Sequence, residues 1–218
     1  MKVSIGVVAL NEEKTLPSLF DDFKMQTYPH DEIEIILVDG ISTDNTKEIM
    51  QTFKDNNDFL EVKILDNPKK IQSAGWNIVI KNFTGDVLVR IDAHSSIPRD
   101  FIEKNVKNIK SGEDVSGGKR PNIIDDDTGY KIMLLEAESS MFGSGIAPFR
   151  NASGKKYVKS MFHAMYKREV LEKVGFFNEK LLRTEDNEFH YRIRKAGYKL
   201  CYNDNIVSYQ HTRNSLLK

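Results

Sequence analysis

The sequence predicts an α/β fold in which helices flank a largely parallel β-sheet. Through the first half of the chain, apolar runs rich in Val and Ile alternate with segments whose apolar residues recur at helical spacing. The runs lack regular polar alternation, which indicates strands buried on both faces. Strands of this kind, joined by helices, form parallel sheets in layered α/β domains. With 218 residues, the chain is long enough for one large domain with a sizeable core.

Four strands and three helices are expected in order along the first half. The strands are the runs "VSIGVVAL", "IEIILVDG", "EVKIL" and "DVLVRID". Apolar residues at helical spacing predict a helix after each of the first three strands, around residues 16–23, 42–53 and 74–80. Ser42, Thr43 and Asp44 offer N-caps for the second of these helices.

The second half is less regular. Two Gly-rich segments, residues 116–129 and 141–156, are expected to be loops. Helices are expected between these loops and at two later segments, which end at Gly175 and Gly197, with a strand in "YKLCY" beyond the last. Because no repeat or clear linker divides the chain, we expect one domain over residues 1–218.

The composition restricts the class of protein. Lys+Arg and Asp+Glu number 32 each, and this balance argues against a domain whose main role is to bind nucleic acid. A single cysteine excludes an intrachain disulfide, and no apolar run reaches the length of a membrane span. We therefore expect a cytoplasmic domain. The end at "NSLLK" lacks an obvious stop, so a further C-terminal segment beyond Lys218 is left open.

Polar side chains follow three of the expected strands: Asn11 and Glu12, then Asp39, then Asp92 and His94. The carboxyl ends of parallel strands meet at one edge of a sheet, so these side chains should converge on one crevice. A carboxylate and an imidazole at positions 92 and 94 suit Mn²⁺, with Mg²⁺ as the second choice. The alternative is a turn in which Asp92 caps backbone amides.

The other candidate residues each have a structural alternative. Asp39 could accept a hydrogen bond from a uracil imide or a ribose hydroxyl, or could cap the next helix. Asp186 could accept a proton from an attacking hydroxyl, although acidic residues at the start of a helix are also explained by the macrodipole. His211 could turn toward a metal or be a surface histidine. Lys70 could neutralise a diphosphate or lie on a solvated face.

The order of these segments resembles that of the family 2 glycosyltransferases. The resemblance rests on "VVALNEEKTL", "ILVDGISTDNT", "NPKKIQSAGWNIVIKNFTGDVLVRIDAHS" and "LLRTEDNEFHYRIRKAG" and extends from Val3 to about Arg213. The segments "RIDAHS", "GGKR", "FGSG", "YKREV" and "TEDNEFHYR" are most similar to the succinoglycan-biosynthesis, ExoA-like branch. The resemblance implies the GT-A fold, with a nucleotide-sugar-binding half at about residues 1–95 and an acceptor-binding half at about residues 96–218.

The resemblance also implies roles for individual residues. Asp92 matches the first position of the Asp-x-Asp metal motif, and Asp186 matches the general base of inverting transfer. His94 and Gly40 stand where the second Asp of two motifs is usual, which weakens the metal and nucleobase assignments. The donor site is expected to include Ala9, Asn11, Glu12, Asp39, Lys70 and Asp92. The metal is expected on Asp92, His94 and His211, and the acceptor near Phe142, Gly143, Gly145 and Glu185.

The expected activity is inverting transfer of a sugar from a nucleotide-diphosphate donor, with UDP favoured, to a glycan or lipid-linked hydroxyl. Mn²⁺ or Mg²⁺ would assist, and the setting would be surface polysaccharide synthesis at the inner face of the cell membrane. The Gln-x-x-Arg-Trp signature of processive synthases is absent after Asp186, which favours single-sugar transfer. Homo-oligomerisation is left open. A nucleotidyltransferase is the alternative enzyme, although "ALNEEKTL" has no phosphate-binding glycine. A degenerate nucleotide-binding domain is the non-enzymatic alternative.

Overall fold

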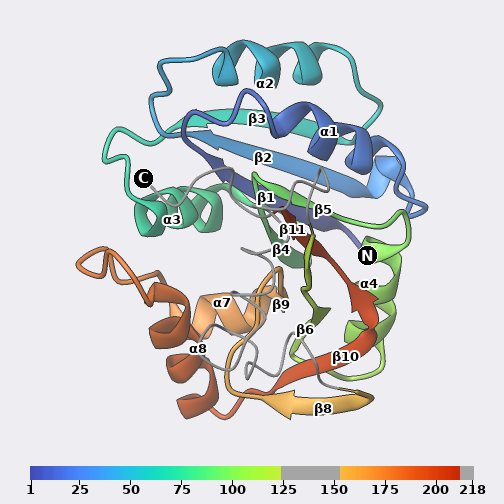
Figure 1. The fold of residues 1–218 in the computed structure, drawn as a ribbon. Coiled ribbons are helices and arrows are strands. Elements are labelled where there is room, and N and C mark those ends of the chain that lie inside the picture. Colours follow the sequence, from blue (N-terminus) through green and yellow to red (C-terminus); the bar gives the residue numbers. More distant parts are fainter. Residues whose placement is uncertain (124–152, 212–218) are drawn as a thin grey trace, which may run out of the picture.

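An eight-stranded β-sheet in the order β3-β2-β1-β4-β9-β6-β10-β8 forms the centre of the protein (Figure 1). The computed structural model describes residues 1–123 and 153–211. The bounds of the strands are β1 Val3–Ala9, β2 Ile33–Asp39, β3 Glu61–Asp66, β4 Val87–Asp92, β6 Val115–Lys119, β8 Lys155–Val158, β9 Met165–Lys167 and β10 Leu200–Val207.

Strands β3, β2, β1 and β4 pair in parallel, and these are the four strands expected from the sequence. Strand β9 joins β4 to β6 by antiparallel pairing on both sides, β6 and β10 are parallel, and β8 closes the edge in antiparallel orientation. The prediction of a mostly parallel sheet flanked by helices is therefore confirmed.

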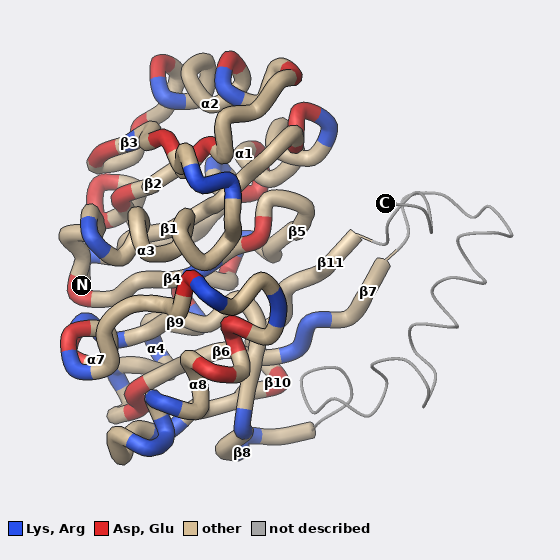
Figure 2. Tube along the Cα trace, turned by 90° about the vertical axis from the view of Figure 1, so that its left-hand side faces the viewer, with Lys and Arg blue, Asp and Glu red and all other residues tan. Residues whose placement is uncertain are grey.

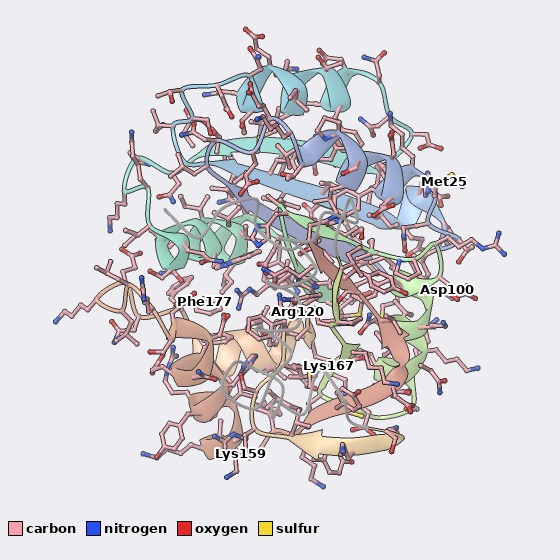
Figure 3. The ribbon with its side chains drawn as sticks, in the orientation of Figure 1. Met25, Asp100, Arg120, Lys159, Lys167 and Phe177 are labelled. Carbon is pink, nitrogen blue, oxygen red and sulfur yellow. The ribbon has the colours of Figure 1, made fainter. Side chains whose placement is uncertain are left out.

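Alternate residues of the strands face two separate cores. Ile35 and Leu37 point to one face, where α1 (Leu16–Lys24), α2 (Thr46–Asp55) and α4 (Phe101–Lys110) pack. Ile36 and Val38 point to the other face, which α3 (Gln72–Asn82), α7 (Arg168–Val174) and α8 (Glu185–Lys195) cover. On this second face Phe177 lies between α3 and the α7–α8 pair (Figure 3) and stacks on Phe189 of α8, with ring centroids 4.1 Å apart.

A second, three-stranded sheet lies beside the carboxyl end of β4. It consists of β5 (Ser95–Ser96), β11 (Tyr209–His211) and β7 (Asn122–Ile123), with β11 in the middle. In Figure 2, β7 and β11 extend away from the body of the large sheet. The same view shows Lys and Arg interspersed with Asp and Glu along the trace, in agreement with the zero net charge. In the described parts of the chain, no helix is both long and apolar enough to cross a membrane.

Several sequence expectations need correction. Within the two expected loops, residues 122–123 form β7 and residues 155–156 begin β8. Residues 116–119 were expected in a loop but belong to β6, because Gly118 lets β10 approach closely. An added Cβ at Gly118 would lie 2.0 Å from the Ile206 carbonyl oxygen. The N-cap of α2 is Asn45, one residue after the segment 42–44 that was expected to cap it. The helix expected at 130–141 and the loop over 141–152 lie outside the described residues.

Candidate active site

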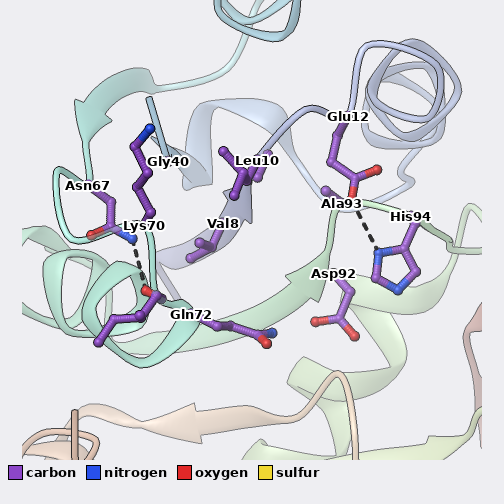
Figure 4. Close-up of a pocket in the computed structure, with 12 residues that line it drawn as sticks. Val8, Leu10, Glu12, Gly40, Asn67, Lys70, Gln72, Asp92, Ala93 and His94 are labelled. Atoms are coloured by element: carbon purple, nitrogen blue, oxygen red, sulfur yellow. Dashed lines mark hydrogen bonds and ion pairs between the residues drawn. The ribbon is translucent and has the colours of Figure 1, made fainter. Parts of the chain in front are cut away.

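A pocket of about 220 Å³ opens at the carboxyl ends of β1 and β4 (Figure 4). Strand β1 lies between β2 and β4, so the strand order reverses here, and ligands of open α/β sheets bind at such points. The two strands contribute Val8 to Leu10 and Asp92 to His94. The residues that line the pocket are Val8, Ala9, Leu10, Glu12, Gly40, Asn67, Lys70, Ile71, Gln72, Asp92, Ala93 and His94. Five predicted site residues thus meet in one cavity: Ala9, Glu12, Lys70, Asp92 and His94.

Glu12, Asp92 and His94 form one side of this pocket (Figure 4). Oε1 of Glu12 lies 3.7 Å from Nδ1 of His94, and Nε2 of His94 lies 3.0 Å from Nε2 of Gln210. The interaction with Glu12, followed by the charge of Asp92, raises the pKa of His94 against the opposing effect of burial. The imidazole is therefore held between two carboxylates at the pocket rim.

Asp92 is held from behind by His163, a residue that sequence reasoning missed. Nε2 of His163 lies 3.3 Å from Oδ2 of Asp92 and 3.0 Å from Oγ of Ser95, and its Nδ1 lies 2.8 Å from Oγ of Ser208. Burial by itself would raise the pKa of Asp92, but the contact with His163, together with the nearby charges of His94 and Arg90, holds that pKa well below its usual range. The carboxylate that faces the pocket is therefore ionised.

The opposite side of the pocket comes from the segment between β3 and α3. The amide of Gln72 points toward the carboxylate of Asp92, whereas the side chain of Lys70 extends toward Gly40 (Figure 4). Asn67 is buried and donates from Nδ2 to the Ile71 carbonyl, 2.9 Å away. Its Oδ1 has no hydrogen-bond partner among the described residues. Asn67 follows β3 directly, so the strand-end pattern that selected Asp39 and Asp92 could have selected it as well.

Asn11 and Asp39 do not line the pocket. The Asn11 side chain accepts a hydrogen bond from the Thr43 N–H at 2.8 Å, and both carboxylate oxygens of Asp39 lie 3.2 Å from the Ser42 N–H. Each residue thereby holds the loop from β2 to α2. Asp39 does not cap the helix, which was the alternative, because Ser42 precedes α2 and the N-cap of that helix is Asn45. Gly40, the neighbour of Asp39, does line the pocket. The nucleotide-binding roles of Asn11 and Asp39 stay predictions.

Asp186 lies in the first turn of α8, which begins at Glu185 as expected, after Thr184 in a left-handed conformation (φ 63°). Its Oδ1 accepts a hydrogen bond from Nη1 of Arg90 in β4. Arg90 and Asp92 are two residues apart on one strand and therefore share a face of the sheet. Glu185 is 8% exposed, and burial, together with the charge of Asp186, raises its pKa. Arg90 thus lies between the candidate base and the candidate metal ligand.

His211 of β11 contacts His94 and Ser96. Its backbone N–H donates to the His94 carbonyl at 3.3 Å, and its Nε2 lies 3.2 Å from Oγ of Ser96. Within residues 1–123 and 153–211, no three His, Cys, Asp or Glu side chains converge as a metal site. The role of His211 as a metal ligand stays a prediction. Three expected acceptor residues, Phe142, Gly143 and Gly145, lie outside the described part of the chain.

The chemistry of the pocket rim fits a divalent cation in part. Asp92 offers carboxylate oxygens and His94 offers an imidazole nitrogen, two kinds of donor that suit Mn²⁺ and, less well, Mg²⁺. Hard divalent cations commonly take further ligands from substrate phosphates. A cation at this rim is therefore compatible with the residues present, and its binding stays a prediction.

Comparison with known proteins identifies the family. Residues 4–175 match the glycosyl transferase family 2. The chain belongs to this family. The match covers most of the 218 residues, and it confirms the prediction of a glycosyltransferase domain. It also disfavours the alternative enzyme, a nucleotidyltransferase.

Two curated relatives cover nearly all of this family 2 chain. The succinoglycan biosynthesis protein ExoA of Rhizobium meliloti is 30% identical over 98% of the chain and 64% of its own length. The dolichyl N-acetyl-alpha-D-glucosaminyl phosphate 3-beta-D-2,3-diacetamido-2,3-dideoxy-beta-D-glucuronosyltransferase of Methanococcus voltae is 29% identical over 99% of the chain and 68% of its own length. The chain spans about two thirds of the length of these relatives. The predicted resemblance to family 2 and its ExoA-like branch is confirmed.

Solved structures confirm the GT-A fold of this family 2 domain. TarS of Staphylococcus aureus in complex with UDP superposes with a TM-score of 0.76 at 19% identity, over 97% of this chain and 61% of TarS. The mannosyltransferase PcManGT of Pyrobaculum calidifontis, in complex with GDP-Man and Mn²⁺, gives a TM-score of 0.76 at 21% identity, over 99% of this chain and 58% of PcManGT.

Proposed function

We propose that this domain transfers a sugar, with inversion, from a UDP-linked donor to a hydroxyl of a glycan or lipid-linked acceptor in surface polysaccharide synthesis. The observation that carries the proposal is the arrangement of two acids about β4. Asp92 lines the pocket at the strand end, and Asp186 is hydrogen-bonded to Arg90 on the same face of that strand. This arrangement supports a donor site next to a general base.

The donor nucleotide is assigned to the pocket. Its walls combine apolar residues near β1 with polar groups. One of these groups is Oδ1 of Asn67, which has no hydrogen-bond partner in the described part of the chain. A buried acceptor of this kind gains free energy when a ligand N–H reaches it, because an unsatisfied polar atom is costly to bury. The UDP and GDP-Man complexes of the structural neighbours support a nucleotide-sugar, and the UDP complex supports the choice of uridine.

The diphosphate is assigned to the side of the pocket that carries Asp92, Glu12 and His94. Mn²⁺ or Mg²⁺ held there by Asp92 and His94 would neutralise the charge that develops on the leaving nucleoside diphosphate. Glu12 lies against the His94 imidazole and would orient it toward the cation. The Mn²⁺ in the neighbouring mannosyltransferase complex supports this assignment.

Asp186 is assigned the role of general base. The acceptor oxygen forms a bond to the anomeric carbon as the bond from that carbon to the diphosphate oxygen breaks, and the acceptor's proton passes to Asp186. Because no enzyme nucleophile intervenes, the anomeric configuration inverts. Arg90 occupies Oδ1 of Asp186, which leaves Oδ2 for the proton. General-base assistance of this kind contributes roughly 10²–10⁴-fold in rate.

The first test is a panel of nucleotide-sugars, assayed for nucleotide release with Mn²⁺ or Mg²⁺ and with mono- and oligosaccharide or lipid-phosphate-linked acceptors. We expect acceptor-dependent release from UDP-sugars that EDTA abolishes. NMR of the product should show the anomeric configuration opposite to that of the donor. UDP that fails to bind in calorimetry, with Mn²⁺ or without it, would identify a degenerate domain instead.

The second test is Asp186→Asn. The amide still accepts a hydrogen bond from Arg90 but takes up no proton, so transfer should fall by about 10²-fold or more while UDP affinity stays within about threefold. Asp21→Asn, an exposed acid on α1, is the matched control and should leave both unchanged. Equal loss of transfer and UDP binding in Asp186→Asn would contradict the assignment of the base.

A further inference from the structure

Arg90 is buried in β4, a strand whose other central residues are apolar. It is 7% exposed, and its guanidinium carbon lies 4.2 Å from the Trp76 ring centroid and 4.8 Å from the Phe177 ring centroid. The two aromatic rings come from α3 and from the segment before α8, so three parts of the fold meet at this side chain. Stacking of this kind fixes the plane of a guanidinium.

We propose that Arg90 is a positioning residue that orients the carboxylate of Asp186, an inference that rests on the function proposed above. Nη1 of Arg90 donates to Oδ1 of Asp186. Among the described residues, Asp186 has no other ion pair or side-chain hydrogen bond, so Arg90 alone restrains its carboxylate there. The contact leaves the second oxygen, Oδ2, available to an acceptor hydroxyl.

A general base needs such a restraint. Its oxygen must lie within about 2.6–3.2 Å of the hydroxyl whose proton it takes, and a displacement of about 1 Å costs on the order of 10²-fold in rate. Asp186 lies in the first turn of α8, after Thr184 in a left-handed conformation, and its side chain is partly exposed. Without Arg90 the carboxylate would be free to change rotamer.

Stabilisation of the fold does not by itself explain this arginine. Nε of Arg90 is buried and has no hydrogen-bond partner among the described residues, which costs roughly 1–3 kcal/mol. An apolar side chain between Trp76 and Phe177 would avoid that cost. Arg90 also precedes Asp92 by two residues, so one strand carries both the group that orients the base and the predicted metal ligand. Strand β4 thereby fixes the spacing between the residue that orients the base and the predicted metal ligand.

The test compares Arg90→Met and Arg90→Lys with Asp186→Asn in the same transfer assay. Methionine keeps the length and the packing between the two rings but removes the donor. We expect kcat to fall by about 10²-fold in Arg90→Met, while the donor KM and the calorimetric UDP affinity stay within about threefold. Arg90→Lys keeps a charged donor without the planar fork and should recover part of the loss.

Arg168→Met is the matched control. The Arg168 guanidinium also lies 4.2 Å from an aromatic centroid, that of Phe83, and has a carboxylate neighbour, Glu172, but it lies at the amino end of β4. Arg168→Met should lower the melting temperature and leave kcat unchanged. Wild-type kcat in Arg90→Met, or equal losses of kcat and UDP affinity, would overturn the positioning role. Wild-type kcat in Asp186→Asn would instead refute the base assignment of the proposed function.

Discussion

The buried imidazole of His163 lies against the carboxylate of Asp92, a residue that lines the pocket. Nε2 of His163 lies 3.3 Å from Oδ2 of Asp92, and the opposite ring nitrogen is fixed 2.8 Å from Ser208 Oγ. His163 is 4% exposed and has a positive φ of 47°, a conformation that costs a non-glycine residue free energy. The fold thus maintains a strained, buried histidine where it can orient a carboxylate of the candidate metal site.

We therefore predict that His163→Gln weakens metal-dependent binding of UDP. Residues that orient metal ligands typically contribute 10–100-fold to metal affinity. Calorimetric titration of UDP with and without Mn²⁺ should show that the gain from Mn²⁺ falls by about that factor, whereas binding without metal is unchanged. His190→Gln is the control, because His190 is equally buried but contacts Tyr166 and Ser160 instead. A wild-type Mn²⁺ gain in His163→Gln would refute the supporting role.

The first half of the fold could be predicted because its signal is local. The parallel strands β1, β2 and β4 are apolar runs, and three polar residues that follow or end β1 and β4 line the pocket: Glu12, Asp92 and His94. The contact of His163 with Asp92 could not be predicted, because 71 residues separate them and no local pattern encodes their distance. Arg90 gave no signal for a related reason, since a lone charge in a strand does not reveal its partner. Strand β6 was missed because the glycines that permit its close pairing also characterise loops.

Glu34 of β2 provides a prediction about stability. Its side chain is fully buried and accepts hydrogen bonds from Lys63 at 2.6 Å, from Ser4 at 2.5 Å and from the Thr84 N–H at 2.8 Å. Glu34→Ala removes the common acceptor of these donors, so the free energy of unfolding should fall by about 3 kcal/mol or more. Urea denaturation measures this change.

Glu61 is the matched control for Glu34, because it pairs with the same lysine. Its carboxylate lies 3.3 Å from Nζ of Lys63 but is 49% exposed. Glu61→Ala should therefore change the free energy of unfolding by less than about 1 kcal/mol. Similar losses of unfolding free energy in the two variants would show that burial does not determine how much each carboxylate stabilises the fold.

Gly75 of α3 allows the helix to pack against β1 at the floor of the pocket. A Cβ at Gly75 would lie 2.5 Å from Cγ1 of Val8, a pocket residue. Gly75→Ala should therefore destabilise the fold by about 1–3 kcal/mol and weaken UDP binding, because Val8 must shift. The double variant Gly75→Ala with Val8→Ala restores the space, and thermal denaturation should show that it is more stable than the sum of the single changes implies. Additive losses would contradict the steric explanation.

His190 gives the fold a pH dependence that Gln does not reproduce. Burial in α8, between Tyr166 and Ser160, lowers the pKa of His190 to about 4, although the charge of Asp186 opposes this effect. The unfolded chain binds the proton near pH 6.5, so between pH 6.5 and 4 the unfolded state holds more protons and stability falls as the pH falls. The contribution is on the order of 3 kcal/mol across that interval. Above pH 6.5 the histidine is neutral in both states and contributes no pH dependence.

The difference in free energy of unfolding between wild type and His190→Gln, measured by urea denaturation at pH 7, 6, 5 and 4, should therefore shift progressively against the wild type at lower pH. A difference that stays constant over these pH values would mean that His190 becomes protonated equally in both states, which contradicts its burial as a neutral ring.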